Sequence, residues 1–122
     1  MVSAKVMIVE DEYIIATDLS EMVESLGYQV CARLDTGEEA VQQALSERPD
    51  LVLMDIRLRG RMDGLEAASE IERRLNVPVV FLTACNEHDL AARHPFNPRR
   101  FIPKPFASHT IEKAITQALD NR

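Results

Sequence analysis

Hydrophobic positions follow two patterns along the chain, short continuous runs and apolar residues spaced three or four apart. The runs indicate buried strands and the spaced positions indicate helices with one apolar face. Strands are predicted near residues 5–9, 28–32, 50–54, 77–82 and 100–103. Helices are predicted over 13–26, between Thr36 and Pro49, over 65–75 and over 111–119. The chain therefore alternates strands with helices.

Residues 86–100 break this regularity. Asn86 is a suitable N-cap for a short helix that runs to about Arg93, where Pro95 and Pro98 stop it because proline cannot continue a helix. We therefore expect the fourth helix to be shortened or irregular. The first two helices have clearer end signals. Gly27 can adopt the left-handed conformation that ends the helix 13–26, and Thr36 with Glu39 predicts a capping box at the start of the second helix.

Alternating strands and helices predict an α/β fold, doubly wound, with a five-stranded parallel sheet. The run 50–54 is almost wholly apolar, as expected for a strand covered on both faces. A chain of 122 residues is the size of one domain. Sheets of this kind bind ligands beyond the carboxyl ends of their strands.

Polar residues stand at those strand ends. Glu10 and Asp11 follow the first strand, Asp55 the third, Thr83 the fourth and Lys104 the fifth. If strands one and three are neighbours, three carboxylates converge, and they repel one another unless a cation lies among them. Oxygen ligands favour Mg²⁺, with Mn²⁺ as a substitute, and such a site suits phosphoryl transfer.

Composition narrows the choice of partners. The net charge is −6, from 14 basic and 20 acidic residues, which disfavours direct binding to nucleic acid or to an anionic membrane. No apolar run reaches the ~20 residues that span a bilayer, and the first residues do not resemble a secretory signal. We expect a cytoplasmic protein whose Cys31 and Cys85 are free thiols.

Five motifs in order resemble the receiver domain of bacterial two-component response regulators. They are Val6–Glu12, Pro49–Asp55, Asp63–Leu65, Phe81–Ala84 and Phe101–Phe106. The resemblance runs the whole chain and implies a flavodoxin-like sheet of order 2-1-3-4-5. Residues 1–122 would then be a single receiver domain, either a stand-alone regulator or one domain of a longer protein.

The resemblance also implies the chemistry. Asp55 would be the phosphoacceptor, taking a phosphoryl group from the phosphohistidine of a sensor histidine kinase or a phosphotransfer protein. Mg²⁺ would be held by Asp11, Asp55 and the backbone carbonyl of Arg57, with Glu10 acting through water. Lys104 would pair with Asp55 at rest and later with the phosphoryl group, and its peptide bond to Pro105 would be cis.

A switch is implied as well. The Thr83 hydroxyl would donate to the phosphoryl group, and the side chain of Phe101 would then turn inward. This would change the surface formed by helix four, strand five and helix five, which a downstream protein target reads, and a phosphorylation-dependent homodimer is a further expectation. Phe101 lacks the hydroxyl of the tyrosine common in this family, so it can act only by packing.

Some residues depart from the family pattern, and other functions compete. Eight positions separate Asp55 from Asp63, one more than in most receivers, and the intervening loop is basic. One alternative is a phosphorylation-independent receiver that only binds protein. Another is an aspartate-nucleophile phosphohydrolase, which the arginine at position 57 disfavours because such enzymes usually carry a second acid there. We therefore do not expect an enzyme with substrate turnover.

Overall fold

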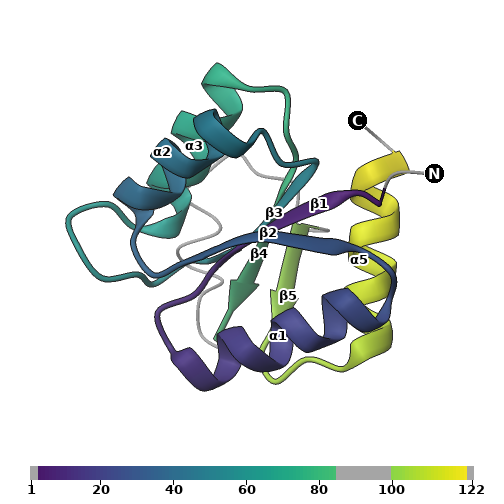
Figure 1. Ribbon diagram of the computed structural model, residues 1–122. Coiled ribbons are helices and arrows are strands. Elements are labelled where there is room, and N and C mark those ends of the chain that lie inside the picture. Colours follow the sequence, from purple (N-terminus) through teal and green to yellow (C-terminus); the bar gives the residue numbers. More distant parts are fainter. Residues whose placement is uncertain (1–2, 85–99, 121–122) are drawn as a thin grey trace.

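A computed structural model describes residues 3–84 and 100–120 of the chain. Its core is one parallel sheet of five strands in the order β2-β1-β3-β4-β5 (Figure 1), as predicted. The strands are β1 (Lys5–Val9), β2 (Gln29–Leu34), β3 (Leu51–Asp55), β4 (Val79–Thr83) and β5 (Phe101–Pro103). The helices are α1 (Tyr13–Ser25), α2 (Gly37–Glu47), α3 (Gly64–Arg74) and α5 (Ser108–Asp120). The irregular helix predicted within 86–100 lies outside the described residues, except for Arg100.

Helices cover both faces of the sheet, α2 and α3 on one and α1 and α5 on the other (Figure 1). Successive side chains of a strand point to opposite faces, so both must be apolar when both faces are covered. In β1, Met7 and Val9 pack toward α2 and α3, whereas Val6 and Ile8 pack toward α1 and α5. This explains the continuous apolar runs of the sequence.

The register of the strands places their carboxyl ends together at one edge of the sheet. Val9 lies opposite Met54 across β1 and β3, so the residues that follow these strands are neighbours. Asp55 pairs with Leu82, and Thr83 pairs with Pro103. Because β1 and β3 are neighbours, Glu10, Asp11 and Asp55 can converge as predicted.

Most element boundaries lie within two residues of the predictions, and α5 begins three residues before the predicted start at 111. The strand β4 begins at Val79 rather than at 77, after Pro78, which has no N–H to donate to a sheet. The strand β2 extends to Leu34 rather than ending at 32, and its half-exposed position at the sheet edge weakens the apolar pattern there. In the described part of the chain, no helix is long and apolar enough to cross a membrane.

Two helix caps refine the sequence prediction. The Thr36 side chain accepts a hydrogen bond from the Glu39 backbone N–H, but the Glu39 carboxylate accepts from the Thr36 hydroxyl rather than from its backbone, so the predicted capping box is only half formed. A complete box begins α3, where Asp63 and Glu66 exchange side-chain to backbone hydrogen bonds. The Asp-x-x-Glu spacing of residues 63–66 is the signal of this box, which was not among the predicted caps.

Candidate phosphoryl-transfer and metal site

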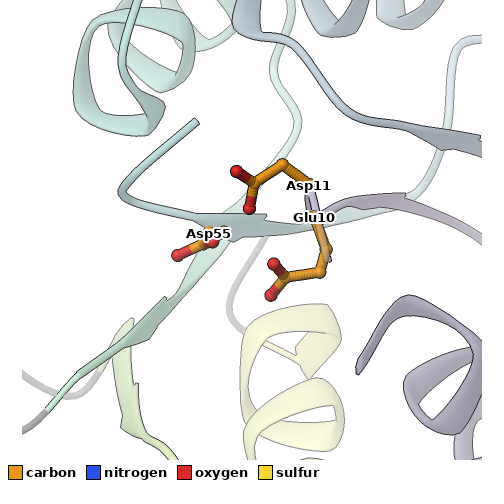
Figure 2. Close-up of side chains that lie close together, drawn as sticks. All are labelled: Glu10, Asp11 and Asp55. Atoms are coloured by element: carbon orange, nitrogen blue, oxygen red, sulfur yellow. The ribbon is translucent and has the colours of Figure 1, made fainter. Parts of the chain in front are cut away.

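Three carboxylates meet at the carboxyl edge of the sheet (Figure 2). Glu10 and Asp11 follow β1, and Asp55 is the last residue of β3. One oxygen from each side chain lies within 4.8 Å of the others. Glu10 and Asp55 are 3% and 5% exposed, whereas Asp11 is half-buried. The structure thus brings together the three acids that the sequence predicted.

The start of α3 lies directly against the backbone of Asp55. The Gly64 N–H donates a hydrogen bond of 2.7 Å to the Ile56 carbonyl. A Cβ atom at position 64 would lie 2.0 Å from the Asp55 carbonyl oxygen and 2.8 Å from the Ile56 Cα. Only glycine permits this approach. Gly64 belongs to one of the five motifs, but the motif alone does not indicate that this glycine packs against the backbone of Asp55.

Lys104 supplies a positive charge between two of these acids. Its backbone N–H donates to the Thr83 carbonyl at 2.8 Å, which ties the end of β5 to the end of β4. The Lys104 ammonium lies 2.8 Å from Glu10 Oε1 and 3.4 Å from Asp55 Oδ2. The predicted ion pair with Asp55 is therefore present, but the shorter contact, which was not predicted, is with Glu10. The Lys104–Pro105 peptide bond is cis, as the resemblance implied.

Burial and neighbouring charge set the protonation of the site. Desolvation by burial, reinforced by the negative charge of Glu10, raises the pKa of Asp55 to about 7 despite the nearby Lys104. Burial lowers the pKa of Lys104, but its hydrogen bond to Glu10 and the charge of Asp55 outweigh this and raise its pKa overall. Lys104 therefore stays protonated at neutral pH. The ionised form of Asp55 remains disfavoured despite Lys104, so a further cation beside it would stabilise that form.

The donor set fits a hard divalent cation. Glu10, Asp11 and Asp55 offer carboxylate oxygens close enough to share one ion, and all-oxygen ligands favour Mg²⁺ or Mn²⁺ over softer metals. Arg57 lies beside them, since its backbone N–H donates to Asp55 Oδ1 at 3.3 Å. The use of the Arg57 carbonyl as a ligand stays a prediction.

The two predicted switch residues lie on neighbouring strands. Thr83 ends β4 one residue beyond the Asp55 partner Leu82, and its hydroxyl donates to the Ala84 carbonyl at 2.8 Å. Phe101 begins β5, is half-buried, and stacks on Phe81 with ring centroids 5.0 Å apart. Thr83 thus lies at the strand end next to Asp55, whereas Phe101 pairs with the middle of β4. Cys85 lies outside the described residues.

Comparisons with known proteins agree on one family. A family model described as the response regulator receiver domain matches residues 6–116. The transcriptional regulatory protein PdtaR of Mycobacterium tuberculosis is 39% identical over 97% of this chain and 58% of its own length. The phyllosphere-induced regulator PhyR of Methylorubrum extorquens is 40% identical over 96% of this chain and 44% of its own length. The chain thus spans about half the length of these curated relatives.

A solved structure supports the same relation. The signal receiver domain of a modulated diguanylate cyclase from Desulfovibrio desulfuricans superposes with a TM-score of 0.91 at 38% sequence identity. The match covers 98% of this chain and 95% of that one. Fold and sequence therefore point to the same class of domain.

Proposed function

The chain belongs to the response regulator receiver domain family, and on that premise we propose that Asp55 accepts a phosphoryl group from a phosphohistidine on a partner protein. The observation that carries the proposal is the position of Asp55. Its buried carboxylate lies among the oxygens of Glu10 and Asp11, with the Lys104 ammonium 3.4 Å away. Residues 1–122 would form a single receiver domain and would act as a signalling module without substrate turnover.

The residues of the chain divide the work of the transfer. An Asp55 carboxylate oxygen forms the new bond to phosphorus while the bond from phosphorus to the histidine nitrogen breaks, and that nitrogen keeps the electron pair. Lys104 is placed to pair with a phosphoryl oxygen once Asp55 is modified. Glu10, Asp11, Asp55 and the Arg57 carbonyl would hold Mg²⁺ or Mn²⁺, which when bound supplies positive charge that offsets the charge of the phosphoryl oxygens.

The phosphodonor would be a sensor histidine kinase or a phosphotransfer protein, and a downstream protein would read the modified state. The relatives PdtaR and PhyR carry the names of a transcriptional regulatory protein and a phyllosphere-induced regulator. Their names support a regulatory output, which this chain would deliver through contact with another protein or with a second copy of itself.

Incubation with acetyl phosphate tests the proposal without knowledge of the kinase. With Mg²⁺ present, intact-protein mass spectrometry should show a gain of one phosphoryl group, lost in Asp55→Asn and lost with EDTA. Asp18→Asn on the exposed side of α1 is the matched control and should be modified normally. If neither acetyl phosphate nor a beryllofluoride titration engages the site, the chain is instead a phosphorylation-independent binding module.

The switch is a second step of the same proposal, in which the Thr83 hydroxyl donates to the phosphoryl group and the Phe101 side chain then turns inward. Thr83→Ala should be phosphorylated but should respond less, because the hydroxyl that would leave Ala84 for the phosphoryl group is missing. Backbone amide NMR spectra with and without beryllofluoride measure the response at β5. Thr116→Ala, on the exposed face of α5, is the control. An unreduced response in Thr83→Ala would remove Thr83 from the switch.

A further inference from the structure

The loop between β3 and α3, residues 56–63, lies against the start of α2 (Figure 1). The Glu38 carboxylate accepts hydrogen bonds from two backbone N–H groups of this loop, from Arg61 at 3.4 Å and from Met62 at 3.2 Å. Thr36, just before α2, forms an isolated parallel bridge with Arg59. The contact therefore joins segments more than 20 residues apart in sequence.

Two glycines allow the loop and the helix to approach this closely. Gly60 has a φ of +92°, and a Cβ there would lie 2.6 Å from Glu38 Oε2. On the helix side, a Cβ at Gly37 would lie 2.7 Å from the Met62 carbonyl oxygen. Both surfaces thus lack a side chain at the point of contact, which leaves the Glu38 carboxylate to fill the space beside Gly60.

The loop is also the segment that completes the candidate site. It follows Asp55 directly, and it contains Arg57, whose N–H bonds Asp55 Oδ1 and whose carbonyl is the fourth proposed metal ligand. Leu58 and Met62 pack against the core on the α2 and α3 face. These apolar contacts anchor the side chains of the loop to the core, whereas the backbone N–H groups of residues 61 and 62 are bound by Glu38.

We propose that Glu38 is a positioning residue, which orders the loop after Asp55 so that Arg57 is already in place when a divalent cation binds. This inference rests on the proposed function. Glu38 itself is exposed, so its hydrogen bonds contribute little to the free energy of unfolding of the domain. Their main effect is to restrict the conformations of the loop 56–63. A loop that is ordered in advance binds its ligand without a further loss of conformational entropy.

Removing the carboxylate should therefore weaken metal binding while leaving the fold intact. We expect Glu38→Ala to weaken the binding of Mg²⁺ by about threefold to tenfold, because the loop must then be ordered by the metal itself. Glu38→Gln keeps one oxygen acceptor of similar reach and should fall between Glu38→Ala and the wild type. Linkage also requires that Mg²⁺ slows exchange of the Arg61 and Met62 amides.

The matched control is Glu39→Ala. Glu39 carries the same charge at the next position of α2, but its carboxylate bonds Thr36 and not the loop. The experiment measures the Kd for Mg²⁺ alone by calorimetry, hydrogen exchange over residues 57–63 without metal, and the melting temperature of each variant. We expect a higher Kd for Mg²⁺ and faster loop exchange in Glu38→Ala than in Glu39→Ala, at similar melting temperatures.

Two failures can be told apart. If wild-type protein binds Mg²⁺ and Glu38→Ala binds it equally well, or if the loop amides exchange no faster in that variant, Glu38 does not position the loop and the proposed function is untouched. If wild-type protein binds no Mg²⁺, the proposed metal site is wrong, and this inference falls with it.

Discussion

Gly64→Ala should destabilise the domain by about 3 kcal/mol or more and should displace Asp55. The added methyl group would lie 2.0 Å from the Asp55 carbonyl oxygen and 2.8 Å from the Ile56 Cα, and all of these neighbours are backbone atoms that no side-chain rotation can move aside. Either α3 or the end of β3 must shift. Because Asp55 ends β3, phosphorylation by acetyl phosphate should slow together with the loss of stability.

Thermal and denaturant unfolding measure the first effect, and for a domain of this size we expect a fall in Tm on the order of 10 °C. The control is Gly27→Ala, in a turn where φ is +96° but nothing lies within 4 Å of the added atom. That variant should lose about 1 kcal/mol from backbone strain alone and should keep its reactivity. Equal stability losses with unchanged phosphorylation in both variants would contradict the close approach at Gly64.

Asp55→Asn should raise the stability of the metal-free protein at neutral pH, although it removes the reactive group. In the folded protein the pKa of Asp55 is raised from 3.8 to about 7, chiefly by burial and then by the charge of Glu10. The protonated form is therefore favoured by folding. This contribution is fully present below pH 3.8 and is lost as the pH rises to about 7. Asparagine is neutral at every pH and avoids the loss.

The size of the effect is bounded by the shift. Each pKa unit corresponds to about 1.4 kcal/mol, so the upper limit is roughly 4 kcal/mol, a limit that already includes the contact with Lys104, and we expect on the order of 2 kcal/mol. Urea unfolding in EDTA, from pH 4 to pH 8, should show a stability difference between Asp55→Asn and wild type that grows with pH and levels off above 7.

Asp18→Asn on the exposed side of α1 should show no such growth. Added Mg²⁺ should stabilise wild type more than Asp55→Asn, because the cation offsets the same negative charge that asparagine removes. An Asp55→Asn variant that is less stable than wild type at pH 8, or a difference that does not depend on pH, would show that Asp55 is not held in an environment that disfavours its charge.

The parts of the fold that could be predicted from the sequence are those with a repeating pattern. All five residues of β3 are buried, and an apolar run that ends in an acid shows both the strand and the position of Asp55 at its end. The same reasoning placed Glu10, Asp11, Thr83 and Lys104 at one edge, because parallel strands present all their carboxyl ends together. The roles of these residues came from the family resemblance.

The contacts that could not be predicted depend on tertiary geometry. The Lys104 ammonium lies 2.8 Å from Glu10 and 3.4 Å from Asp55, and which acid is nearer depends on side-chain conformation rather than on the order of residues. The pairing of Glu38 with the N–H groups of Arg61 and Met62 is set by how closely two glycines let α2 and the loop approach. No pattern along the chain encodes such distances.

Chemical mapping of the modified residue tests most directly whether Asp55 is the nucleophile. Protein treated with acetyl phosphate and Mg²⁺ would be reduced with borohydride, which converts an acyl phosphate to an alcohol, then digested and sequenced by tandem mass spectrometry. We predict homoserine at position 55 and unchanged acids at positions 10 and 11. Reduction at Glu10 or Asp11 with Asp55 intact would contradict this prediction.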